Sequence, residues 1–261
     1  MTFLDEILAL KRSRVEQAKA ACDLTELKAK AANIRSKAKH FALSSALKNP
    51  DKIHVIAEIK RASPSKGIIN DKINVAEVAR NYGNGGAAAI SVLTEEDRFK
   101  GSLEDLKTVR AQASLPILRK DFIFDEFQIT EAAAAGADVI LLIVAMLDDE
   151  DLKRLYDFAD ALGLDVVVEV HTLEELKRAE NLNAKLVGVN NRDLHSFKVS
   201  LDVSRRLIKH APENALTICE SGISTKEEIL ELRELGFSGF LIGETLMRSE
   251  NVAEELKRLT T

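Results

Sequence analysis

A carboxylate and an ammonium stand close together at the end of an apolar segment near residue 58. Glu58 and Lys60 are two residues apart, so on a β-strand their side chains lie on the same face. Burying both charges beside apolar residues is costly unless they pair or bind a ligand. A loop rich in Ser, Pro and Gly follows at residues 63–67. We therefore interpret this strand end as the wall of a polar site.

Charged and polar side chains follow later apolar segments in the same way. They are Glu95 with its acidic neighbours, Lys120 between Arg119 and Asp121, Glu169, Asn190 with Arg192, Glu220 with Ser221, and Glu244. Acids and bases that share a water-poor pocket shift one another's pKa values, which general acid–base catalysis requires. Salt bridges between neighbouring strands are the competing interpretation, and they explain single residues better than the whole set.

Two glycine-containing loops late in the chain indicate a phosphate site. Residues 221–224 (SGIS) and 242–245 (IGET) each follow an apolar segment. Barrels of parallel strands commonly hold a phosphate in the loops after strands seven and eight. Gly222 and Gly243 let backbone N–H groups approach the ligand, with Ser221 and Glu244 beside them and Lys60 adding a positive charge. A glycine needed only for a tight turn is an adequate explanation for one of these loops, but a weaker one for both.

The elements that would position these side chains alternate regularly along the chain. Besides the run that begins at Val55, apolar segments occupy residues 89–93, 116–118, 139–146, 165–168, 186–189, 216–219 and 239–242. Each is followed by a loop and by a segment with helical spacing. Eight repeats of strand and helix predict a parallel sheet covered on both faces. The sequence thus predicts a (β/α)8 TIM barrel, in which catalytic groups gather at the carboxyl ends of the strands.

Length and composition fit one domain. The chain has 261 residues, of which 46% are hydrophobic and 30% charged, and a barrel of this type takes about 250 residues. We expect residues 1–261 to form a single domain, with residues 1–50 as a helical N-terminal extension. Apolar spacing predicts one helix from Phe3 to beyond Val15 and a second from about Leu24 to Lys37. The extension is either a plug under the barrel or a lid over the site, and the pattern favours neither.

Charge and residue usage exclude several classes of protein. A net charge of -5 with interspersed signs offers no basic stripe for nucleic acid. The longest apolar run, residues 139–147, is too short to cross a bilayer. Cys22 and Cys219 are far apart, which fits a reducing cytoplasm. The five histidines form no ligand cluster, so we expect no metal; His171 is assigned a capping or surface role.

Five long motifs resemble those of the indole-3-glycerol phosphate synthase family. They are residues 58–67 (EIKRASPSKG), 91–95 (SVLTE), 118–122 (LRKDF), 188–194 (GVNNRDL) and 220–223 (ESGI). The resemblance runs nearly end to end and includes the N-terminal extension. It implies conversion of 1-(2-carboxyphenylamino)-1-deoxyribulose 5-phosphate to indole-3-glycerol phosphate, with loss of carbon dioxide and water, without a cofactor or metal. The implied partner is a phosphorylated small molecule, and we expect a monomer or a weak homo-oligomer.

The resemblance also implies roles for single residues. Lys120 matches the general acid of ring closure, Glu169 a carboxylate that moves protons in dehydration, and Lys60 a lysine that contacts the substrate's carboxylate. Further implied site residues are Glu58, Asn190, Glu220, Arg192, Ser221, Ser63 and Phe122. Some relatives carry a small hydroxyl residue at the position of Glu244, so we expect only its backbone to meet phosphate.

Two other functions remain open on the sequence. Phosphoribosylanthranilate isomerase, another phosphate-binding barrel, would need a Cys and Asp pair, and neither Cys22 nor Cys219 follows the first strand. A non-catalytic barrel that binds phosphorylated metabolites is the second, which the set of Lys60, Lys120 and Glu169 argues against.

Overall fold

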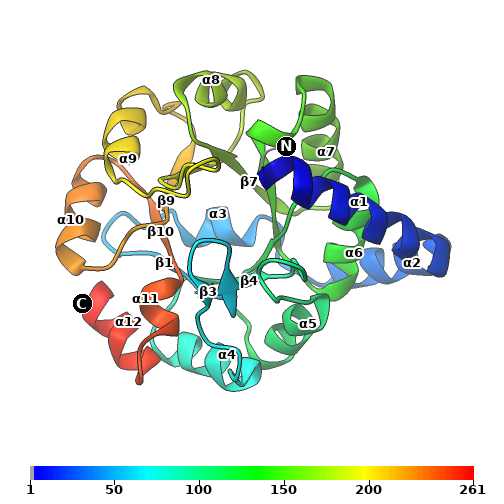
Figure 1. Cartoon of the computed structure of the whole chain (residues 1–261), viewed down its shortest axis with the longest axis horizontal. Helices are drawn as coiled ribbons and strands as arrows, with labels where there is room; N and C mark the ends of the chain where they lie inside the picture. The colour runs from blue at the N-terminus through cyan, green and yellow to red at the C-terminus, as the bar shows by residue number, and fades with distance from the viewer. Residues whose placement is uncertain (1–2) are drawn as a thin grey trace.

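The computed structural model describes residues 3–261, and a closed barrel of parallel strands forms its centre (Figure 1). The strands are β1 (Val55–Ile59), β4 (Ala89–Leu93), β5 (Ile117–Lys120), β6 (Val139–Ile143), β7 (Asp165–Val170), β8 (Leu186–Asn190), β9 (Leu216–Glu220) and β10 (Gly239–Ile242). Strand β1 closes the ring by pairing with both β10 and β4. The TIM barrel prediction is therefore confirmed. The strand predicted over residues 139–146 stops at Ile143, because Val144–Met146 forms a turn of 3-10 helix, η1.

Helices follow the strands and surround the barrel (Figure 1). They are α4 (Val75–Asn84), α5 (Leu103–Gln112), α6 (Glu126–Ala135), α7 (Asp149–Ala161), α8 (Leu173–Asn181), α9 (Asp202–Leu207) with the 3-10 turn η2 (Ile208–His210), α10 (Lys226–Glu234), α11 (Glu244–Met247) and α12 (Val252–Thr260). Their ends have the expected chemistry: Thr225 and Glu228 form a capping box on α10, and Gly136 ends α6 in the left-handed conformation. Within residues 3–261 no helix is both long and apolar enough to cross a membrane.

The strands bury side chains on both faces. One set fills the barrel interior, including Ile56, Leu118, Val167 and Ile218. The other set packs under the surrounding helices, including Val168. This double burial explains why the strands are almost continuously apolar until their last residues, where charged side chains enter the cavity described below.

Helix α1 (Phe3–Ala21) lies on the side of the barrel where the strands end (Figure 1). The Phe3 ring packs edge-on against Phe122, with ring centroids 6.4 Å apart. Lys11 of α1 is buried and forms a 2.9 Å ion pair with Asp121, the residue after β5. This part of the extension therefore lies at the mouth, in the position that a lid would take.

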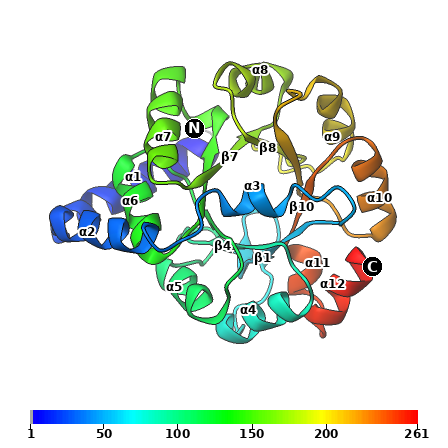
Figure 2. The same ribbon diagram turned by 180° about the vertical axis from the view of Figure 1, so that it is seen from behind.

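Two further helices carry the chain to the opposite end of the barrel. Helix α2 (Leu24–Arg35) packs beside α6, and α3 (Ala42–Ala46) crosses beneath the barrel (Figure 2). Leu43 and Leu47 enter the interior cluster. Asp165, the first residue of β7, accepts a hydrogen bond from the backbone N–H of Leu43 at 2.8 Å. The extension thus places α1 in the position of a lid and α3 in the position of a plug.

A small antiparallel hairpin rises from the end of β1, formed by β2 (Ala62–Ser63) and β3 (Gly67–Ile68). It stands over the centre of the barrel (Figure 1). The sequence predicts a loop here, because strands of two residues leave no alternating pattern.

Candidate active site

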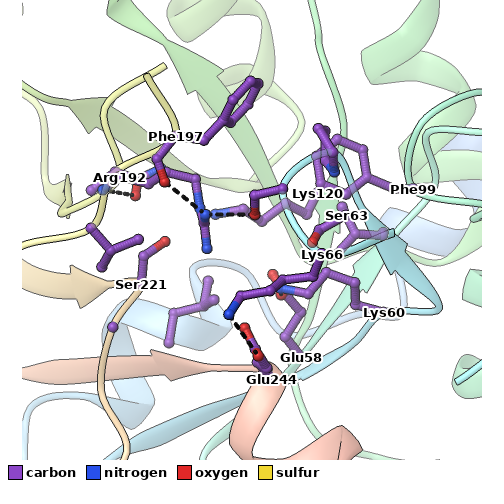
Figure 3. Close-up of a pocket in the computed structure, with 18 of the residues that line it drawn as sticks. Glu58, Lys60, Ser63, Lys66, Phe99, Lys120, Arg192, Phe197, Ser221 and Glu244 are labelled. Atoms are coloured by element: carbon purple, nitrogen blue, oxygen red, sulfur yellow. Dashed lines mark hydrogen bonds and ion pairs between the residues drawn. The ribbon is translucent and has the colours of Figure 1, made fainter. Parts of the chain in front are cut away.

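A cavity of about 870 Å³ opens at the carboxyl ends of the strands (Figure 3). Most of the side chains selected from the sequence lie on its wall. These are Glu58, Lys60, Ser63, Lys120, Phe122, Glu169, Asn190, Arg192, Ser221, Gly222, Gly243 and Glu244. Glu220, which was also assigned to the site, is buried at the end of β9 behind Lys120. Parallel pairing explains this convergence, because it aligns neighbouring strand ends, for example Asn190 with Glu220.

Lys120, the last residue of β5, is held between two carboxylates. Its Nζ atom lies 3.2 Å from Oε2 of Glu169 and also contacts Oε2 of Glu220. Burial alone would lower the pKa of Lys120, but the two carboxylates outweigh burial and raise the pKa above its ordinary value. Lys120 is therefore an ammonium at neutral pH, and it supplies both a positive charge and a proton to the cavity.

The two carboxylates beside Lys120 have opposite pKa shifts. Burial raises the pKa of Glu220 to about 7, and repulsion by Glu169 adds to the rise. At Glu169, burial is outweighed by Lys120, His171 and a 3.1 Å hydrogen bond from Nδ2 of Asn190, so the pKa is lowered. Near neutral pH Glu169 is a base while Glu220 still exchanges a proton. Two carboxylates with separated pKa values are the arrangement that acid–base catalysis uses.

Two glycines make room for two of the cavity's carboxylates. A Cβ atom at Gly188 would lie 2.2 Å from Oε1 of Glu220, and one at Gly243 would lie 2.4 Å from Oε1 of Glu58. Any other residue would push these carboxylates away. On the sequence, Gly243 was assigned only to phosphate and Gly188 had no assigned role. The carboxylates that these glycines face are known only once the strands are paired.

Glu58 and Lys60 form an ion pair of 2.6 Å at the end of β1. The structure confirms that the two side chains share one face and pair. The hydroxyl of Tyr82 donates a 2.8 Å hydrogen bond to the carbonyl of Glu58, which fixes the strand beneath the pair. A substrate anion that reaches Lys60 would compete with Glu58 for its ammonium.

The two glycine loops lie side by side on the cavity wall. Ser221 and Gly222 both have positive φ, at 67° and 87°. The hydroxyl of Thr245 donates to the carbonyl of Ile223 at 3.1 Å and so ties one loop to the other. The two loops are therefore fixed beside each other, and their service to one ligand stays a prediction.

The carboxylate of Glu244 is neutralised by two cations. Arg248 lies 3.1 Å from its Oε1 atom. Lys66 lies 3.8 Å from the same atom (Figure 3). Both cations also line the cavity. The negative charge that the sequence places beside the phosphate loops is therefore paired.

Aromatic rings form the opposite part of the wall. Phe3 packs edge-on against Phe197, with centroids 5.1 Å apart, and Phe99 lies 6.2 Å from Phe122. Leu141 and Ile143 complete an apolar surface. Only Phe122 was predicted from the sequence. The other three rings come from α1 and from two loops far apart in the chain, so no local pattern indicates them.

Arg192 connects the loop after β8 to the hairpin over the mouth. Its Nη1 atom donates to Oγ of Ser65 at 2.8 Å and to the carbonyl of Phe197 at 3.3 Å (Figure 3). Its backbone N–H donates to Oδ1 of Asn190 at 3.0 Å. Arg192 therefore holds both the hairpin and the aromatic loop in place.

The family model described as indole-3-glycerol phosphate synthase matches residues 4–259. The chain belongs to this family. Indole-3-glycerol phosphate synthase from Carboxydothermus hydrogenoformans is 45% identical over 261 residues, covering 98% of this chain and 99% of that protein. The Aquifex aeolicus protein of the same name is 46% identical over 262 residues, with 99% of each covered. The resemblance inferred from the motifs is confirmed.

Solved structures with lower identity share the fold alone. Thiamine phosphate pyrophosphorylase from Pyrococcus furiosus matches with a TM-score of 0.59 at 21% identity, covering 82% of this chain and 95% of that one. The N-acetylmannosamine-6-phosphate 2-epimerase from Clostridium perfringens matches with a TM-score of 0.61 at 19% identity, covering 80% and 93%. Both comparisons support the barrel.

The cysteines take no part in the wall of this synthase-family cavity. Cys219 is buried in β9 against Asn191 and Ser204, and burial raises the pKa of its thiol to about 11. Cys22 lies just beyond α1. The isomerase considered above would need a reactive thiol in the cavity, and this placement does not favour it.

Three acidic residues after β4 come close enough together to suggest a cation site. They are Glu95, Glu96 and Asp97. Glu95, however, accepts three backbone N–H groups of its own loop, Glu96 pairs with Lys11, and Asp97 pairs with Arg14. Because these oxygens are already engaged, the cluster organises the loop and anchors α1 of this family member.

His171 is the residue whose sequence assignment needs correction. Its backbone N–H donates to Oε2 of Glu175 at 2.7 Å, but the side chain that caps α8 is that of Thr172, so a capping role is wrong. A surface role is wrong, because its side chain is only 11% exposed and its ring faces Glu169. No signal in the sequence shows this, since the ring reaches Glu169 across the strand end.

Proposed function

We propose that this protein converts 1-(2-carboxyphenylamino)-1-deoxyribulose 5-phosphate to indole-3-glycerol phosphate, carbon dioxide and water. Its full-length similarity to indole-3-glycerol phosphate synthases supports the proposal. The observation that carries it is the ammonium of Lys120 between Glu169 and Glu220, in a cavity with an aromatic side and two glycine loops. Such a site can protonate a ketone, hold an aryl ring and bind a phosphate together.

In this proposal Lys120 delivers a proton to the ketone oxygen while the ring carbon attacks the ketone carbon. Its raised pKa keeps it charged until the substrate binds. Glu220, which contacts Lys120 from behind, exchanges protons near neutral pH and can recharge it. Departure of carbon dioxide then restores the aromatic ring.

Glu169 serves the dehydration that completes the indole. Its lowered pKa keeps it ionised and able to take a proton from the carbon skeleton. The ammonium of Lys60 gives a proton to the departing hydroxyl, which leaves as water. Lys60, held by Glu58, contacts the substrate's carboxylate and takes part in proton transfer. Asn190 holds Glu169 by its 3.1 Å hydrogen bond.

The remaining wall residues place the substrate. We propose that its aromatic ring lies against Phe122, with Leu141 and Ile143 beside it. Its phosphate lies between the two glycine loops, where the residues we assign to it are Ser221, Gly222, Gly243 and the backbone of Glu244, with Lys60 nearby. Arg192 and Ser63 complete the binding surface.

A fluorescence assay for indole formation from synthetic substrate tests the proposal. The wild-type protein should form the product, and Lys120→Ala should lower the rate by about two to four orders of magnitude. Inorganic sulfate should still raise the melting temperature of this variant, because the phosphate loops are intact. Absence of product with the wild type would overturn the proposal, and stabilisation by sulfate alone would then favour a non-catalytic barrel.

Further properties complete the proposal. We expect residues 1–261 to unfold as one domain, in a single calorimetric transition. Light scattering should give a monomer or a weak homo-oligomer. Activity should survive treatment with a chelator, because no metal or cofactor is needed, and the protein should work in the cytoplasm.

A further inference from the structure

The imidazole of His171 lies between two carboxylates. Its Nδ1 atom is 3.2 Å from Oε2 of Glu175, in the first turn of α8. Its Nε2 atom is 3.5 Å from Oε1 of Glu169, an ion-pair distance, on the side facing away from Lys120. Glu175 is itself fixed, because the same Oε2 atom accepts the backbone N–H of His171 at 2.7 Å. A nearly buried ring is thus fixed against the carboxylate we assign to dehydration.

A neutral imidazole fits this geometry less well than a charged one. It has one N–H donor and one acceptor nitrogen, whereas both of its nitrogens here face carboxylate oxygens. Glu169 cannot relieve the conflict by holding the proton itself, because Lys120 and Asn190 donate to its two oxygens and favour the ionised form. The arrangement therefore favours the doubly protonated imidazolium, whose second N–H faces Glu169 across 3.5 Å.

The charged groups that face the ring come from three elements. They are Glu169 on β7, Glu175 on α8 and Glu220 on β9, and each of them favours the imidazolium. Burial would lower the pKa of His171, but these carboxylates outweigh burial and raise the pKa above its ordinary value. The positive charge of Lys120 disfavours a charged His171, but Lys120 lies on the other side of Glu169.

We propose that His171 is a positioning residue that decides which carboxylate of the buried pair is the base. Held protonated by Glu175, it keeps Glu169 ionised and aimed by Oε1, so that the proton of the pair resides on Glu220. The inference rests on the proposed function only in taking Glu169 as the group whose ionisation limits the reaction at low pH. The division of acid and base then follows from a residue that does not line the cavity.

Two variants remove the charge while they keep the shape. His171→Gln places a neutral amide donor toward Glu169, and Glu175→Gln keeps an acceptor for the backbone N–H of His171 but removes the carboxylate from Nδ1. Glu174→Gln is the matched control, because it removes the same charge from the same exposed first turn without contact to the ring. Thermal melting shows whether each variant is folded.

The first readout is the pH dependence of kcat/KM. Loss of the imidazolium raises the pKa of Glu169, so the acid limb should move to higher pH by about one unit in His171→Gln and Glu175→Gln. The substrate ionises in the same way with every variant, so a difference in the acid limb between variants comes from the enzyme. The limb should stay in place in Glu174→Gln. An unchanged limb in both test variants would overturn the inference.

The second readout needs no turnover. Proton NMR of the imidazole signals should give His171 a pKa above the ordinary 6.5 in the wild type, lower by about one unit in Glu175→Gln and unchanged in Glu174→Gln. A wild-type value at or below 6.5 would refute the inference even if the enzyme is active. A protein that shows the expected NMR shifts but makes no product would refute the proposed function instead.

Discussion

Gly188→Ala adds one methyl group and no charge, yet it should disable the cavity. The new Cβ atom would lie 2.2 Å from Oε1 of Glu220 and 2.9 Å from Cγ1 of Val167. An ordinary contact needs about 3.5 Å, so the carboxylate must move by about 1 Å. A misplacement of about 1 Å can cost about 100-fold in rate. Gly188 has no positive φ, so the backbone itself accepts Ala.

The assay is steady-state indole formation, with thermal melting in parallel. We expect kcat to fall about 100-fold while the protein stays folded. Gly83→Ala is the matched control, because a Cβ atom at this position in α4 meets nothing within 4 Å. It should leave kcat unchanged and stabilise the helix by about 0.5–1 kcal/mol.

A double variant separates this mechanism from general damage. In Glu220→Ala the colliding carboxylate is gone, so adding Gly188→Ala should lower the rate little further. A wild-type rate in Gly188→Ala would refute the reasoning. So would an equal loss of rate in both backgrounds, because the methyl group would then act through something other than Glu220.

Three more predictions concern the lid, the buried acid and the phosphate loops. Phe3→Ala should raise KM with little change in melting temperature, whereas Leu47→Ala should lower the free energy of unfolding by about 2–5 kcal/mol with KM unchanged; kinetics and melting distinguish them. The pKa of Glu220 lies near 7 when folded, above its ordinary 4.5, so the folded protein binds the extra proton and wild-type stability falls as pH rises through that window. Glu220→Gln should therefore melt progressively higher relative to wild type between about pH 5 and pH 8. Gly222→Asp, which adds a charge at a positive φ, should weaken stabilisation by sulfate by about ten- to a hundredfold, more than Ser221→Ala.

Each of these has a contrary outcome. Equal changes in KM for Phe3→Ala and Leu47→Ala would show that α1 and the α3 segment do not have separate roles as lid and plug. Parallel melting curves of the Glu220 variant and the wild type against pH would show that this carboxyl titrates normally. Undiminished protection by sulfate in Gly222→Asp would place the phosphate elsewhere.

The barrel was predictable because each strand is buried on both faces. Continuous apolar segments, separated by helical spacing, leave few alternatives to a closed parallel sheet. The strand ends were predictable for the same reason, since a charge that ends such a segment must lie where the cavity opens. This is why Lys120 and Glu169 could be chosen from the sequence alone.

Features that depend on contacts between distant segments could not be predicted. The role of Gly188 appears only when β8 is paired with β9, and the ring of Phe3 reaches the cavity only through the path of α1. His171 looks like an ordinary polar residue before a helix until Glu169 and Glu175 are seen on either side of it. Sequence patterns report burial and local geometry, but not which side chains meet across the sheet.

Strand β7 carries one residue that stabilises the fold and one that faces the reaction cavity, and the two can be changed separately. Asp165 at its first residue fastens the plug helix, and Glu169 four residues later faces the reaction cavity. At about 3.3 Å per residue, some 13 Å separates them, beyond the range over which substitutions usually influence one another. Substitutions near Asp165 can therefore change the stability of the protein, while substitutions near Glu169 change its reaction.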